Sequence, residues 1–169
     1  AYAFGGDLNN LDPAFEFWTQ MAEDGRINTL DILQQNFETG EIPVGVIWSF
    51  TAIPYKDQIT KYKLQANIPT DGSIMSGYAS VINKYAPHPC AAALAREYIF
   101  SDEGQANLAA AGAIPTRTDV EIPDDIQNAT FKSEDYANAI PMEDTDAYTK
   151  ACETVVERWQ EEITPLLVQ

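Results

Sequence analysis

The apolar positions of the chain recur at helical spacing in three amphipathic segments. Residues 12–24 carry apolar side chains at i, i+3, i+6 and i+7, which predicts a helix with one buried stripe. A second helix is expected over residues 29–38, where Gly40 ends it. A longer helix is expected over residues 143–163, where apolar side chains recur every four positions until Pro165 stops the helix.

Between these segments the pattern changes to short apolar runs that are typical of strands. Residues 43–48 are nearly all apolar, which predicts a strand covered on both faces, followed by a loop over residues 49–54. Residues 64–68 and 74–83 predict two further strands, the second bent at Gly77. The alternation of helices and strands favours an α/β fold, with a mixed sheet flanked by helices.

A further pair of helices is expected in the middle of the chain. Two prolines precede an alanine-rich helix predicted over residues 90–100, and Ser101 caps the next helix, over residues 102–111. Residues 117–142 contain few apolar side chains. We expect them to be mostly loop, with one short helix near residues 133–138.

The chain is strongly acidic, with a formal net charge of −16. Because phosphate binding needs clustered lysine and arginine, this charge argues against a nucleic-acid partner. The simplest role of the acidic residues is a solvated surface that aids solubility. No apolar run in the sequence approaches the roughly 20 residues that cross a bilayer.

Two features of the chain relate to export. The sequence begins AYAFGG, with neither Met nor a basic segment, so we expect its N-terminus to have been cut. Cys90 and Cys152 could form a disulfide in an exported protein. The helical face that Cys152 shares with Tyr148, Val155 and Trp159 instead favours a buried free thiol. The sequence leaves both alternatives open.

Three motifs follow one another within residues 40–120. They are GEIPVGVIWS, IPTDGSIMSGYASVINKYAPHP and AAALAREYIFSDEGQANLAAAGAIPTR. Their turns and their order resemble the second half of ABC transporter extracellular (periplasmic) solute-binding proteins of family 1. The resemblance implies a type II periplasmic-binding-protein-like fold. It also implies that this chain is a C-terminal fragment, with mainly one of the two lobes.

In that family, two α/β lobes close over the ligand and the chain crosses between them more than once. Carried over, residues 1–77 form the first part of lobe two, and residues 78–116 are a crossover segment that belongs to lobe one. Residues 117–169 return to lobe two as its C-terminal helices. We expect the apolar faces of the crossover segment to need a partner, either the missing N-terminal lobe or a second copy of the chain.

The resemblance places the ligand at the crossovers between lobes. Open α/β sheets also bind ligands outside the carboxyl ends of their strands, where the strand predicted over residues 43–48 ends. A Gly-rich turn before the first helix favours an anion or simply a tight bend. Each candidate could instead serve as a core aromatic, a cap or a turn. The candidate ligand-binding residues are Trp48, Ser49, Phe50, Tyr55, Gly72, Ser73, Tyr78 and Asp7.

The resemblance implies a solute-binding component of an ABC importer. It would capture a small ligand noncovalently in an inter-lobe cleft and present it to a permease in the membrane. The ligand would be a polyamine, a phosphonate, a sugar or a similar small molecule. Trp48, Tyr55 and Tyr78 could form an aromatic box for a cation, and the lack of a Tyr-Tyr pair counts against ferric iron. We expect no cofactor and no metal, and a periplasmic or extracellular location.

Two functions of other classes are alternatives to this one. A small acidic hydrolase would need facing carboxylates, but pairs such as Asp124-Asp125 are adjacent and do not face each other on a helix. The sequence has no nucleophile elbow, zinc-protease motif or P-loop, and its lone His88 lies between two prolines. We therefore expect no enzyme. The other alternative is a stand-alone protein-interaction domain with an exposed apolar helix.

Overall fold

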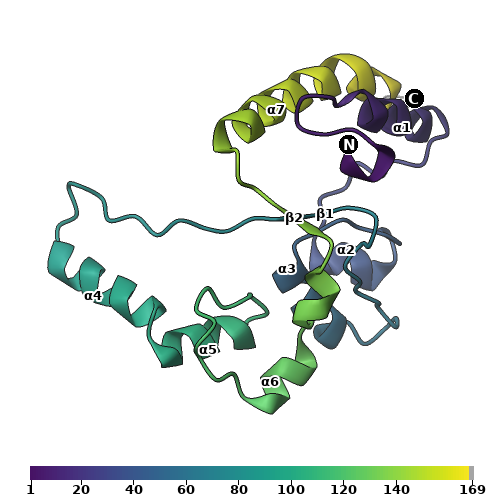
Figure 1. Ribbon diagram of the computed structural model, residues 1–169. Helices are drawn as coiled ribbons and strands as arrows, with labels where there is room; N and C mark the ends of the chain where they lie inside the picture. The colour runs from purple at the N-terminus through teal and green to yellow at the C-terminus, as the bar shows by residue number, and fades with distance from the viewer. Residues whose placement is uncertain (168–169) are drawn as a thin grey trace. The chain divides into compact units, whose positions relative to one another are not determined.

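The computed structural model describes residues 1–167, in which helices dominate (Figure 1). Short 3₁₀ turns lie at Tyr2–Phe4 and at Ser133–Tyr136, the second within the segment expected to be helical. The α-helices are α1 (Asp12–Glu23), α2 (Gln34–Thr39), α3 (Ser49–Gln58), α4 (Pro89–Ile99), α5 (Asp102–Ala110), α6 (Asp124–Ala129) and α7 (Thr145–Arg158). The strands are β1 (Ser73–Met75) and β2 (Ala139–Pro141).

The chain folds as two units, which are described separately. Unit 1 contains Ala1–Asp31, Pro69–Ser76 and Asn138–Gln169. Unit 2 contains Ile32–Ile68 and Gly77–Ala137. Each unit is therefore built from segments that are far apart in the sequence.

The core of unit 1 lies between α1 and the end of the C-terminal helix, which run side by side in Figure 1. Phe15, Ala22 and Ile163 are its buried residues. Trp18 and Trp159 close it with an edge-to-face contact between ring centroids 5.7 Å apart. The stripes predicted over residues 12–24 and 143–163 are confirmed, because both supply this core.

The C-terminal helix ends where its sequence forbids further α-helix. After α7 the backbone widens into a π-turn over Trp159–Ile163, and a 3₁₀ turn over Thr164–Leu166 follows. Pro165 has no N–H to donate to the carbonyl four residues before it, so the regular ladder cannot continue. The Trp159 carbonyl oxygen accepts both the backbone N–H of Thr164 and its hydroxyl, the latter at 3.1 Å.

The sheet is smaller than the sequence suggested. Within residues 1–167 it consists of β1 and β2, which pair in parallel with Ser73 opposite Ala139. The strands predicted over residues 43–48 and 64–68 are wrong: both segments are irregular. Val44 and Val46 are each 83% exposed, so no neighbouring strand covers the first run. The chain is thus helix-rich, with a small parallel sheet.

Unit 2 has its own small core next to α2 and α3. Phe37, Ile42 and Ile59 are buried there, and Tyr55 and Leu64 pack against them. The prediction of a loop over residues 49–54 is wrong, because α3 begins at Ser49. The α2 helix starts later than expected but ends as predicted, at Gly40 in the left-handed conformation (φ 82°).

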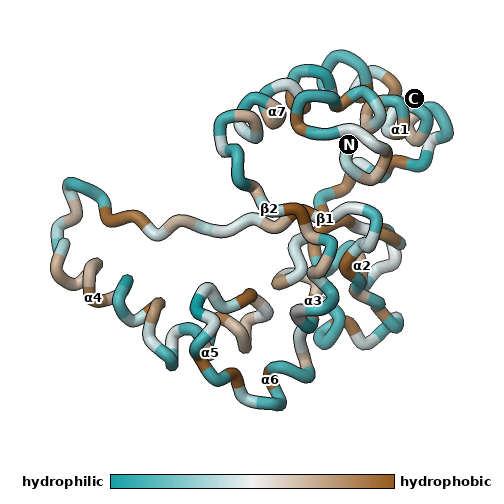
Figure 2. The backbone as a smooth tube through the Cα atoms, in the orientation of Figure 1, coloured by the Kyte–Doolittle hydropathy of each residue, from teal (hydrophilic) through white to brown (hydrophobic). Residues whose placement is uncertain are grey.

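The helical pair α4 and α5 forms as predicted. The Ser101 hydroxyl caps α5 by accepting the Gly104 N–H at 3.1 Å. No residue of α4 is buried. Figure 2 shows hydrophobic residues along the extended chain that precedes α4. This extended chain is itself exposed. Within residues 1–167, no helix is both long and apolar enough to span a bilayer.

Both cysteines are free and exposed. The expectation of a buried Cys152 is wrong because the neighbouring Ala151 takes the core position in α7. One residue along a helix turns the side chain by about 100°. Cys152 therefore lies beside the buried stripe rather than in it.

Candidate functional site

The N-terminus of α3 presents three of the candidate residues together. Trp48 is the N-cap residue in extended conformation (φ −64°, ψ 143°), and Ser49 and Phe50 begin the helix. The cap thus changes backbone direction between Trp48 and Phe50. Their rings nevertheless stack, with centroids 6.4 Å apart and planes 14° apart.

A third candidate joins them from a distant part of unit 2. The ring of Tyr78 meets that of Phe50 edge to face, with centroids 6.0 Å apart. Trp48 is 50% exposed and Tyr78 84% exposed. We call Trp48, Phe50 and Tyr78 the aromatic corner.

The backbone beneath the aromatic corner is fixed by a glycine. Gly112 has φ 89°, and a Cβ placed there would lie 3.2 Å from both the Cα and the carbonyl oxygen of Phe50. A side chain would therefore both strain this backbone and push against α3. The glycine that follows α5 thus also lets the start of α3 approach it.

Two residues near Ser49, Tyr136 and Phe131, were not predicted from the sequence as site residues. Tyr136 forms a side-chain hydrogen bond with Ser49, and its ring meets Phe131 edge to face at 6.1 Å. Burial raises the pKa of the Tyr136 hydroxyl, the Ser49 hydrogen bond opposes that shift, and the negative charge of Asp135 adds to it. The signal in the sequence was the pair of aromatic residues in the mostly polar segment 117–142.

Tyr55 lies apart from the aromatic corner. Its ring meets that of Phe37 edge to face, with centroids 6.1 Å apart, and it packs on the core of unit 2. The structure thus does not bring Tyr55 together with Trp48 and Tyr78, and a ligand-binding role for Tyr55 stays a prediction. Phe50 takes the place of Tyr55.

The remaining candidates belong to unit 1. Gly72 lies against the backbone of Ala3, and Ser73 pairs with Ala139 in the sheet. The carboxylate of Asp7 accepts the N–H groups of Asn9 at 2.7 Å and Asn10 at 2.9 Å, which closes a turn. A ligand-binding role for these three residues stays a prediction.

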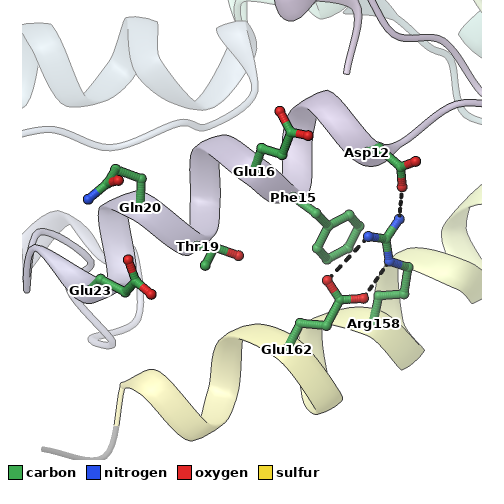
Figure 3. A pocket seen from close by; sticks show the side chains of 8 residues that line it. All are labelled: Asp12, Phe15, Glu16, Thr19, Gln20, Glu23, Arg158 and Glu162. Carbon is green, nitrogen blue, oxygen red and sulfur yellow. Dashed lines mark hydrogen bonds and ion pairs between the residues drawn. The ribbon is translucent and has the colours of Figure 1, made fainter.

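Unit 1 also carries an acidic groove of about 410 Å³ between α1 and the C-terminal helix (Figure 3). The Arg158 guanidinium lies over the Phe15 ring, 4.1 Å from its centroid. It donates to Asp12 at 2.8 Å and to Glu162 at 2.6 Å. The groove is lined by Asp12, Phe15, Glu16, Thr19, Gln20, Glu23, Arg158 and Glu162.

Some of the charged side chains that line the groove pair with one another. The Arg158 hydrogen bond lowers the pKa of the Glu162 carboxyl, and hydrogen bonds to Glu162 and Asp12 raise the pKa of Arg158. The carboxylates best placed to hold a cation already hold Arg158. Among residues 1–167, His, Cys, Asp and Glu form no group of three or more that could hold a metal ion.

Comparison with known proteins gives the family. No curated protein is similar enough to the chain to count as a match. Residues 1–140, by contrast, match the family described as bacterial extracellular solute-binding protein. That match covers most of the chain, including the aromatic corner and all three motifs. The chain therefore belongs to the bacterial extracellular solute-binding proteins, and its place is outside the cytoplasm, in the periplasm or the extracellular space.

Proposed function

We propose that this protein is the solute-binding component of an ABC importer. It captures a small ligand noncovalently in a cleft between two lobes of a type II periplasmic-binding-protein fold and presents it to a membrane permease. The family match over residues 1–140 is the observation that carries the proposal. The order of turns and helices from residue 40 to residue 120 supports it.

Capture without chemistry is the second part of the proposal. Solute-binding proteins generally bind their ligands and release them unchanged. The carboxylates Asp124 and Asp125 lie together in the first turn of α6, where neighbouring residues point in different directions. This arrangement gives no support to an acid–base pair.

The proposed lobe boundaries follow the family resemblance. Residues 1–77 and 117–169 belong to lobe two, and residues 78–116 to lobe one. The apolar side chains of the latter segment pack against the rest of lobe one or against a second copy of the chain. Their exposure supports this: Leu94 is 72% and Val81 84% exposed.

Among the proposed ligand contacts of this chain, the aromatic corner supplies the largest apolar side chains. Aromatic side chains bury large surfaces and dominate binding energies. Ser49 lies between Trp48 and Phe50 in the sequence and adds a hydroxyl at the same place. Gly72, Ser73 and Asp7 are proposed as further contacts.

A binding screen tests the proposal. Polyamines, phosphonates, sugars and metal ions are titrated into the purified protein, and melting temperature and heat of binding are recorded. We expect one saturable small-molecule site and no turnover. Trp48→Ala should weaken that binding by about tenfold or more, as loss of an aromatic anchor does. Unchanged affinity would refute the site, and hydrolysis of an ester or glycoside panel would refute the function.

One observation favours a second candidate, a protein-interaction domain. No residue of α4 is buried, and its apolar side chains include Leu94 and Tyr98. Light scattering after size exclusion helps to distinguish the solute-binding function from the interaction domain. Because the proposed solute-binding protein can also pair with a second copy, self-association favours the interaction domain only where the binding screen finds no solute.

A further inference from the structure

Packing in the core of unit 2 does not explain why the residues of the aromatic corner are aromatic. The buried core residues Phe37, Ile42 and Ile59 are at most 7% exposed. Trp48 and Tyr78, by contrast, keep half or more of their surface in water, so they forgo half or more of the free energy that full burial would give. Tyr78 also lies within residues 76–85, all of which are exposed.

Other aromatic rings are covered by cations of the chain itself. The Lys61 ammonium lies 5.0 Å from the ring centroid of Tyr62, and the Lys84 ammonium 5.6 Å from that of Tyr85. In the part of the chain that the structure describes, no lysine or arginine lies over a ring of the aromatic corner. The exposed parts of the Trp48 and Tyr78 rings, whose faces carry the negative part of the ring quadrupole, therefore remain available to a cation from outside.

The ring faces also decide which ligand charge suits the aromatic corner. Aromatic faces attract a cation and disfavour a phosphonate or a carboxylate ligand. Of the ligand classes considered, a cationic one fits this surface.

We propose that the aromatic corner binds a methylated ammonium group of the solute, an inference that rests on the proposed function. A quaternary ammonium spreads its charge over methyl groups and has no N–H to satisfy. Contact with ring faces is therefore its main source of affinity. A primary ammonium needs acceptor oxygens, whereas the rings of Trp48, Phe50 and Tyr78 offer mostly carbon.

The test uses choline chloride and tetramethylammonium chloride, titrated into the intact protein by calorimetry. We expect both to bind at one site, and the neutral carbon isostere of choline, dimethylbutanol, to bind at least about tenfold more weakly. Tyr78→Leu, which removes the ring but keeps an apolar side chain, should weaken choline binding by about three- to thirtyfold. Tyr78→Phe, which keeps the ring, should change it by less than about twofold.

Tyr85→Leu is the matched control. Tyr85 is also 84% exposed, but it lies outside the aromatic corner, so the substitution should leave choline binding unchanged. Equal losses in both Leu variants, or equal binding of choline and its isostere, overturn the ammonium site. If neither cation binds while another solute binds with dependence on Trp48, the ammonium assignment is wrong and the proposed function stands. If no solute of any class binds, both are wrong.

Discussion

At the scale of single residues, Arg158 links the two helices that build unit 1. Its guanidinium covers the Phe15 ring and pairs with Asp12 and Glu162. Its side chain is 25% exposed, far less than that of Arg26 at 66%, which pairs with Asp24 at 3.5 Å. The two arginines form a matched pair for experiment.

Arg158→Gln should lower the free energy of unfolding by about 1 kcal/mol at neutral pH, the typical worth of a cation over an aromatic ring. Arg26→Gln should change it by less than about half of that. Urea unfolding of both variants measures the difference. Equal effects would show that the Phe15 contact adds nothing.

The same arginine gives a pH dependence. Because Arg158 lowers the pKa of the Glu162 carboxyl, the bond stabilises the fold above the ordinary pKa of 4.5 and is lost as the pH falls through the lowered value. The stability gap between the parent protein and Arg158→Gln should therefore narrow as the pH falls below about 4.5. A gap that stays constant down to pH ~3 would contradict this.

Gln105 is the fully buried polar residue of unit 2. Its amide nitrogen donates to the Ile99 carbonyl oxygen at 2.8 Å. Its amide oxygen accepts the N–H groups of Thr116 at 2.8 Å and Arg117 at 3.1 Å. One side chain thus satisfies three backbone groups and holds the segment after α5 against the corner between α4 and α5.

Gln105→Leu should cost about 2–4 kcal/mol of unfolding free energy, because it leaves buried backbone groups without partners. Gln58→Leu, at an exposed site at the end of α3, is the control and should cost little. Hydrogen exchange should show lost protection at the Thr116 and Arg117 amides in the first variant alone. Retained protection there would mean that other groups hold this segment.

At the scale of elements, the corner between α4 and α5 depends on a small residue. A Cβ added to Gly104 would collide with the Tyr98 carbonyl oxygen and lie 2.9 Å from that of Ile99. Gly104→Ala should therefore destabilise the fold by about 1–3 kcal/mol. Gly77→Ala, where a Cβ meets nothing within 4 Å, should be neutral or slightly stabilising. Thermal unfolding compares the two, and similar melting temperatures would contradict the collision.

At the scale of the whole molecule, the extended chain before α4 is the most accessible segment. Residues 77–88 form no helix or strand, and all but Ala86 are exposed. Trypsin should therefore cut first after Lys84 in the isolated chain, because proteases need an exposed, unpaired backbone. Mass spectrometry of the earliest fragments identifies the site. A first cut elsewhere would mean that this segment is covered in solution.

The sequence by itself determined the helices whose signals are local. The stripes of α1 and α7, the Ser101 cap of α5 and the glycine that ends α2 are set by neighbours within a few residues. The three motifs likewise identified the family, because the order of turn residues along a chain can be recognised without knowing which residues are in contact. These signals need no distant partner.

Only the tertiary structure decided which apolar runs become strands and which aromatics meet. Residues 43–48 look like a buried strand, yet a strand exists only when another strand pairs with it, and that pairing is non-local. Phe50, rather than Tyr55, joins Trp48 and Tyr78, because α3 begins at Ser49 and turns Tyr55 toward Phe37. Contacts between residues this far apart depend on backbone paths that local propensity does not encode.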